Sequence, residues 1–133
     1  MSETSDTQTP VAIVRAWQAA ANAADTDRLL ALSDEQIEII GPRGSAYGHD
    51  ILRQWLARAG LTVEANRFFV RDGAVVVEQH GVWRNVDTGE TMGEADLASS
   101  FRVENGRIKR YARFETLEAA LDDVGLSEGD LVS

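Results

Sequence analysis

The spacing of apolar residues changes once along this chain, at about residue 61, and that change limits the possible folds. Before it, apolar residues recur every three or four positions, as on one face of a helix. After it, apolar and polar residues alternate over long stretches, as in strands with one buried face. Helices followed by strands are typical of an α+β domain, in which the helices cover one face of an antiparallel sheet.

Three helices are predicted in the first part, at residues 11–24, 25–32 and 51–59. Thr9 and Pro10 suit the N-cap and first position of the first helix, and Gly60 suits the end of the third. A short strand is predicted at residues 37–40, between the second and third helices, with a turn at 41–44. The helical part therefore carries one strand that can join a sheet formed by the second part.

Four long strands are predicted in the second part, at residues 63–70, 74–84, 91–103 and 107–115. The segments between them, 71–73, 85–89 and 104–106, are rich in Asp, Asn and Gly, as in the turns of antiparallel hairpins. A short helix is predicted at residues 117–124. A strongly curled antiparallel sheet wrapped around three helices forms a cone, and the mouth of a cone is a natural small-molecule cavity.

The length of 133 residues fits one domain, placed at residues 11–126, with a disordered acidic tail at 1–10 and an acidic tail at 127–133. The net charge of −9 argues against nucleic acid and against anionic membranes as partners, and the excess acid is concentrated at the two ends. Cysteine is absent, which excludes disulfides, thiolate nucleophiles and cysteine zinc sites. Without a signal-like N-terminus or an apolar run of about 20 residues, a cytoplasmic protein is expected.

Four segments of the chain resemble a known family. They are residues 24–32 (ADTDRLLAL), 39–44 with 47–56 (IIGPRG and YGHDILRQWL), 105–108 (NGRI) and 114–126. In this order they resemble the second helix, the first strand with the third helix, the closing hairpin and the terminal helix of the SnoaL-like branch of the nuclear transport factor 2-like superfamily. The resemblance implies a cystatin-like cone with an internal pocket, and frequent homodimers built on the outer face of the sheet.

The resemblance does not determine the chemistry, because the superfamily includes isomerases, cyclases, epoxide hydrolases, dehydratases and proteins without catalysis. The ketosteroid isomerase branch needs an oxyanion tyrosine, a carboxylate base and a protonated aspartic acid. The positions that resemble these three are Trp17, Gly41 and Ser99, so that mechanism is not expected.

Candidates for acid–base chemistry also face away from the expected pocket. The alternation in 91–103 directs Leu97, Ser99 and Phe101 inward and Asp96 outward, which argues against an epoxide hydrolase. By the same alternation His80 faces outward, and His49 stands at a helix start. Neither histidine is therefore expected to serve as the base of a cyclase.

The expected pocket lining is aromatic and mostly uncharged: Trp17, Tyr47, Trp55, Gln79, Trp83, Ser99, Tyr111 and Arg113. For the tryptophans the alternative is a purely structural place in the core. The last strand is ambiguous, because the resemblance directs Tyr111, Arg113 and Glu115 inward whereas hydrophobicity favours Ile108 and Phe114. Burial on both sheet faces or a β-bulge would reconcile the two. An inward Arg113 would need an anionic partner, either a ligand or Glu115.

These observations lead to two hypotheses. The first is a domain that binds a small, hydrophobic, oxygenated molecule without cofactor or metal, with isomerase, cyclase or hydrolase activity left open. The second is a non-catalytic dimeric module whose cone is filled by its own side chains. The direction of Arg113 and Glu115 distinguishes them, because an open polar cavity favours the first hypothesis.

Overall fold

A computed structural model describes residues 9–41 and 44–132, so most of the predicted N-terminal tail and the middle of the turn at 41–44 lie outside the described residues. The helices are α2 (Pro10–Asn22), α3 (Thr26–Ala31), α4 (His49–Ala59) and α5 (Leu117–Val124). The strands are β1 (Ser33–Gly41), β2 (Gly44–Tyr47), β3 (Leu61–Arg71), β4 (Ala74–Arg84), β5 (Thr91–Glu104) and β6 (Arg107–Phe114), followed by a 3-10 turn, η1 (Glu128–Asp130).

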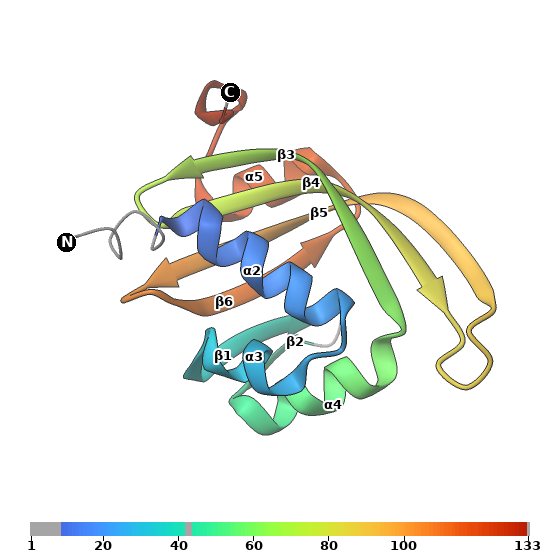
Figure 1. The fold of residues 1–133 in the computed structure, drawn as a ribbon. Helices are drawn as coiled ribbons and strands as arrows, with labels where there is room; N and C mark the ends of the chain where they lie inside the picture. Colours follow the sequence, from blue (N-terminus) through green and yellow to red (C-terminus); the bar gives the residue numbers. More distant parts are fainter. Residues whose placement is uncertain (1–8, 42–43, 133) are drawn as a thin grey trace.

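The strands form one curled sheet in the order β2-β1-β6-β5-β4-β3. All neighbouring pairs are antiparallel except β1 and β6, which run parallel. Helix α2 crosses the concave side of this sheet, α3 and α4 lie beside its β1 end, and α5 lies on the opposite side (Figure 1). The predicted α+β cone is therefore confirmed. None of the described helices is both long and apolar enough to span a bilayer.

Capping residues mark the ends of three helices, and those at Thr9 and Gly60 were expected from the sequence. Thr9 accepts a hydrogen bond from the backbone N–H of Ala12 at 3.2 Å, and Thr116 accepts one from Ala119 at 3.1 Å. These bonds satisfy backbone donors that would otherwise be unpaired at a helix start. At the end of α4, Gly60 has a φ of +56°, which residues with a Cβ rarely adopt. Capping thus fixes where α2 and α5 begin and where α4 turns into β3.

Under α5 the sheet is buried on both faces, which explains three successive buried valines in β4. Val75 and Val77 belong to the inner core beneath α2, whereas Val76 belongs to an outer core beneath α5. All three are fully buried. Burial of this kind on both faces contributes roughly 1.5–3 kcal/mol for each side chain.

Strand β2 was not predicted from the sequence. It pairs with the end of β1, where Ile39 faces Ala46 and Ile40 faces Ser45. Small, largely exposed residues form it, so no apolar alternation marks it as a strand. Strand β1 is also longer than predicted, because it begins at Ser33 directly after α3.

The outer edge of β3 is covered at two places. The side-chain amide of Asn22 pairs with the backbone of Val63, donating to its carbonyl at 2.8 Å and accepting from its N–H at 2.9 Å. Further along, Leu131 forms a β-bridge with Phe69, and the N–H of Val132 donates to the Phe68 carbonyl at 2.8 Å. The acidic segment predicted as a tail thus continues the fold along this edge.

Candidate functional site

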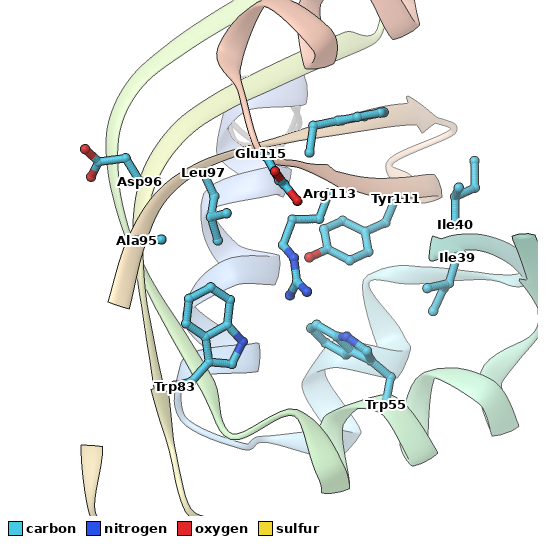
Figure 2. A pocket seen from close by; sticks show the side chains of 11 residues that line it. Ile39, Ile40, Trp55, Trp83, Ala95, Asp96, Leu97, Tyr111, Arg113 and Glu115 are labelled. Atoms are coloured by element: carbon cyan, nitrogen blue, oxygen red, sulfur yellow. The ribbon is translucent and has the colours of Figure 1, made fainter. Parts of the chain in front are cut away.

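A cavity of about 600 Å³ lies at the mouth of the cone, between β1, α4 and the strands β4, β5 and β6. Its walls are mainly aromatic and aliphatic and include Ile39, Ile40, Trp55, Trp83, Leu97 and Phe114. Figure 2 shows Trp55 and Trp83 on opposite sides of the space, each presenting part of its ring to it. The volume lies within the range of about 300–1,000 Å³ that is typical of small-molecule sites.

Arg113 reaches this cavity from β6, where it pairs in register with Ser99 on β5. Its guanidinium carbon lies 5.7 Å from the centre of the Trp83 ring, within the range of a cation–π contact. Among the residues that the structure describes, Arg113 forms no ion pair, either with Glu115 or with another carboxylate. Glu115 also lines the cavity, so both charged side chains of this strand end face the same space.

The ambiguity in β6 is resolved by a bulge together with burial on both faces. Val103 pairs with Ile108, and Arg102 pairs with Arg110, so Lys109 is the extra residue. Ile108 therefore joins the inner core together with Tyr111, although the two are an odd number of positions apart. Phe114 packs against the outer core. The bulge and the burial on both faces therefore together reconcile the family resemblance, which directs Tyr111 and Arg113 inward, with the hydrophobic pattern, which favours burial of Ile108 and Phe114.

Tyr111 forms the floor of the cavity beside Arg113. Its side chain is buried, and that burial raises the pKa of its phenol above the usual value. The positive charge of Arg113, with hydrogen bonding to Ser99 and Arg113, draws this pKa in the opposite direction. At neutral pH Tyr111 therefore keeps its proton and can act as a hydrogen-bond donor.

Beneath this floor the cone is filled by its own side chains. Trp17 stacks on Trp55 with ring centres 5.8 Å apart and meets Phe101 edge-on at 5.4 Å. The indole N–H of Trp17 donates to Ser33 Oγ at 2.9 Å. A cavity of only about 20 Å³ remains at this depth, between Trp17, Trp55 and Tyr111. The interior therefore holds a packed aromatic cluster.

A hydrogen-bonded chain of polar side chains completes the interior. Gln18 Nε2 donates to Gln79 Oε1 at 2.8 Å, and Gln79 Nε2 donates to Ser99 Oγ at 2.9 Å. All three residues are buried. Their polar atoms satisfy one another, so Gln79 and Ser99 lie under the site and do not line the mouth cavity.

The structure thus separates the eight residues expected in the pocket into three groups. It brings Trp55, Trp83, Tyr111 and Arg113 to the mouth cavity, and it places Trp17, Gln79 and Ser99 in the interior. Tyr47 lies outside the cavity, 59% exposed, because β2 directs it to solvent, where its hydroxyl donates to Glu38 at 3.2 Å.

Several wall residues, among them Leu97, Phe114, Ile39 and Ile40, were not among the eight expected pocket residues. Ile39 and Ile40 come from β1, the strand next to β6. They reach the cavity because β1 lies parallel to β6, with Ile39 in register with Tyr111. That pairing joins segments far apart in the sequence, and no local pattern in the chain indicates it. The isoleucines themselves, placed just before a Gly-Pro turn, were the only available signal.

The histidines lie away from the mouth cavity. His80 is on the outer side of the sheet, with Nδ1 2.9 Å from Asp96 and Nε2 2.9 Å from Glu94, so its predicted outward direction is confirmed. Both carboxylates raise the pKa of His80 above the usual value. His49 begins α4, and its Nε2 lies 3.1 Å from the Ser33 carbonyl oxygen. Within residues 9–41 and 44–132, no cluster of three or more His, Asp or Glu residues is arranged to hold a metal ion.

Trp55 also borders a second cavity, of about 530 Å³, between the end of α2, α4 and the start of β3. The residues around it include Ala21, Leu56, Leu61 and Val86. Trp83 does not line this second cavity. The two tryptophans therefore distinguish the two spaces, since only Trp55 is common to both.

Comparison of this chain with known proteins identifies its family. The model of the SnoaL-like domain matches residues 14–111. An NTF2-like protein from Burkholderia xenovorans is 25% identical, with a TM-score of 0.63, over 85% of this chain and 93% of its own. RV0760c from Mycobacterium tuberculosis, in complex with estradiol-17β-hemisuccinate, is 20% identical, with a TM-score of 0.69, over 83% and 96%.

TerC, co-crystallised with polyporic acid, is 18% identical, with a TM-score of 0.69, over 86% of this chain and 97% of its own. No curated protein matches the sequence. The family match covers most of the chain, and the solved structures share its fold. The chain therefore belongs to the SnoaL-like domain family, within the NTF2-like superfamily.

Proposed function

We propose that this SnoaL-like domain binds a small, flat, largely apolar and oxygenated organic molecule in the mouth cavity. The observation that carries the proposal is the cavity of about 600 Å³ with Trp55 and Trp83 on opposite walls. Two half-buried indoles offer a ring system large apolar faces at little cost in side-chain entropy. Structural neighbours solved with polyporic acid and with estradiol-17β-hemisuccinate support small organic ligands for this fold.

The same geometry favours binding over isomerisation by the ketosteroid mechanism. The position of the carboxylate base is Gly41, which carries no proton acceptor. Trp17, at one position that resembles an oxyanion donor, already donates its N–H to Ser33, and Ser99, at the other, is buried and accepts a hydrogen bond from Gln79. The ionisable residues that line the cavity are Asp96, Tyr111, Arg113 and Glu115. The Asp96 carboxylate points away from the other three and contacts His80 (Figure 2), so Tyr111 and Glu115 are the groups placed for proton transfer to a bound molecule.

Amide NMR with 2-naphthamide, a flat and uncharged probe, tests the proposal. Binding in the mouth cavity should shift the indole N–H signals of Trp55 and Trp83 and leave that of Trp17 in place, because the Trp17 N–H is bonded to Ser33 in the interior. Binding in the second cavity would shift Trp55 without Trp83. If 2-naphthamide binds but leaves the indole N–H signal of Trp83 unshifted, the proposal is contradicted.

Variants of the β4–β5 hairpin provide the matched comparison. Trp83→Leu should weaken binding of 2-naphthamide about tenfold, since an aromatic contact contributes about 0.5–1.5 kcal/mol beyond the buried area. Met92→Leu changes a residue of the same hairpin that is 70% exposed and does not line the cavity, so it should leave the affinity unchanged. Equal affinity of Trp83→Leu and the unchanged chain would exclude the mouth cavity as the binding site.

The filled interior favours a second candidate, a non-catalytic module that forms a homodimer through the outer face of the sheet. Trp17, Phe101 and Tyr111 pack against one another below the mouth and leave only a very small cavity. The outer face near His80 and Glu78 is not covered by the outer core under α5, so it is available to a second copy. Sedimentation should then show a two-chain species that dissociates on dilution, and a monomer at every concentration would contradict this candidate.

A further inference from the structure

Arg113 brings a positive charge into a cavity whose walls are otherwise mainly apolar. Among the described residues that line the mouth cavity, Arg113 is the only cation. No carboxylate of the described chain pairs with it, although Glu115 lies on the same strand end. Other arginines have such partners, as Arg110 has Asp123 and Arg67 has Glu78. An arginine facing a cavity without a carboxylate partner has the donors for an anion.

The Arg113 side chain is exposed, and its guanidinium contacts an aromatic ring at the cavity. One side of the guanidinium lies over the ring of Trp83 at 5.7 Å. A guanidinium that contacts an aromatic ring keeps its in-plane N–H groups free, and these groups match the two oxygens of a carboxylate. Figure 2 shows the guanidinium extending into the space between Trp83 and Trp55. The charge therefore lies where a flat molecule between the two indoles would present its edge.

Tyr111 adds a second donor at the same position. Its hydroxyl lies beside the Arg113 side chain in Figure 2 and faces the cavity from the floor. The phenol is buried and keeps its proton, so it can donate a hydrogen bond beside the charged donors of Arg113. Two convergent donors, one of them charged, at the edge of a slot between aromatic rings are the components of a carboxylate site.

We infer that the ligand of the mouth cavity is a flat aromatic acid, whose carboxylate is bound by Arg113 and Tyr111 while its ring lies between Trp55 and Trp83. This inference rests on the proposed function and specifies its ligand class. Glu115 lies at the same cavity and opposes negative charge there. It therefore favours a ligand with a single carboxylate over one with a second negative group on that side.

The test compares 2-naphthoate with 2-naphthamide, which have the same ring system and differ in charge, by isothermal titration calorimetry at pH 7 and low salt. The unchanged chain should bind the carboxylate about tenfold more tightly than the amide, as expected for a hydrogen bond to a charged group. Arg113→Met should bind both probes with equal affinity. Glu115→Gln removes a negative charge from the cavity and should therefore strengthen the binding of naphthoate about twofold.

Arg107→Met is the matched control, because it removes the same charge from the other end of β6, away from the mouth cavity. It should retain the full preference for naphthoate, which separates a specific contact from the effect of net charge. The inference is overturned if the unchanged chain binds both probes equally, or if Arg113→Met keeps the preference. In those cases the proposed function stands, since the amide still binds; if neither probe shifts Trp83, the proposed function fails as well.

Discussion

Gln18 on α2 donates its side-chain amide to Gln79 on β4 over 2.8 Å, in the buried interior of the cone. Gln79 in turn donates to Ser99 on β5 at 2.9 Å. These two hydrogen bonds link α2 to β4 and β5. Hydrogen bonds depend on direction, whereas apolar packing does not. The two bonds therefore fix the position of α2 along the sheet, and with it the floor of the mouth cavity.

Replacing Gln79 by methionine should destabilise the fold. The substitution keeps a similar volume but leaves the Gln18 amide and the Ser99 hydroxyl without their partner. Each unpaired buried group costs about 1–3 kcal/mol, so the free energy of unfolding in urea should fall by about 2–4 kcal/mol. Gln54→Met, on the exposed side of α4, is the control and should change it by less than about 0.5 kcal/mol. An equal loss in both variants would show that the buried hydrogen bonds of Gln79 do not contribute to the free energy of unfolding.

His80 should make stability depend on pH in the neutral range. Hydrogen bonds to Asp96 and Glu94 raise the pKa of His80 in the folded chain above its ordinary value of 6.5. The stabilisation is therefore fully present below pH 6.5 and is lost as the pH rises through the higher folded value. NMR titration of the imidazole should show the raised pKa directly, and His80→Gln should remove this part of the pH dependence.

Asp96→Asn provides the matched test of the cause. The hydrogen bond to Asp96 is the largest contribution to the raised pKa of His80, so this variant should return the pKa toward 6.5. Asp87→Asn removes an equal charge from the exposed turn of the same hairpin and should leave the pKa nearly unchanged. If both variants lower the pKa of His80 by the same amount, the raised pKa comes from the overall negative charge of the protein, and the contact with Asp96 is not its cause.

Asp123 should contribute to stability in acid. Burial raises the pKa of Asp123, but hydrogen bonds from Arg110 and Ser100 and the charges of Arg110 and Arg102 outweigh it, so the pKa lies below the ordinary value of 3.8. The stabilisation is present above pH 3.8 and is lost as the pH falls through the lower folded value.

Asp123→Asn should therefore lower the free energy of unfolding at pH 7 by about 1–2 kcal/mol, with a smaller difference from the unchanged chain near pH 2. Asp122→Asn alters the neighbouring exposed carboxylate and should have little effect at either pH. Urea unfolding at the two pH values measures both. A difference that stays constant between pH 7 and pH 2 would exclude the ionised carboxylate as its source.

A chain that ends at Leu126 should be less stable, by about 1–3 kcal/mol in urea unfolding. It loses the backbone bond from Val132 to Phe68, the bridge from Leu131 to Phe69 and the ion pair of Arg71 with Asp130 at 3.9 Å. Val132→Ala keeps the backbone bond and should cost much less. Equal losses would assign the effect to the valine side chain and leave the covered strand edge without a role.

Sequence patterns predicted those features of the fold that depend on neighbouring residues. The alternation along β5 placed Ser99 and Phe101 inside and Asp96 outside, and all three lie as predicted. The period-two pattern holds because a strand must present alternate side chains to opposite faces. Helix ends at Thr9 and Gly60 were predicted for a similar reason, since capping depends on one or two residues.

The remaining features depend on contacts that the sequence does not encode locally. The interior place of Trp17 depends on Ser33, and the bulge at Lys109 depends on the register with β5. Tyr47 was expected among the aromatic residues of the pocket, but strand β2 directs it to solvent. Half of the expected pocket residues face the mouth cavity, namely Trp55 from α4, Trp83 from β4, and Tyr111 and Arg113 from β6. The other half lie deeper in the cone, as Trp17, Gln79 and Ser99 do, or outside it, as Tyr47 does.

The parallel pairing of β1 with β6 has a consequence for how the chain acquires its fold. Ile39 lies beside Tyr111, so one wall of the mouth cavity joins residues from the beginning and near the end of the sequence. During synthesis β1 leaves the ribosome long before its partner, and until then its isoleucines have no strand to pair with on that side. Contacts between such distant residues also slow folding. A nascent chain therefore completes the cavity only after β6 has been synthesised, and a chain cut short before β6 lacks this wall of the binding site.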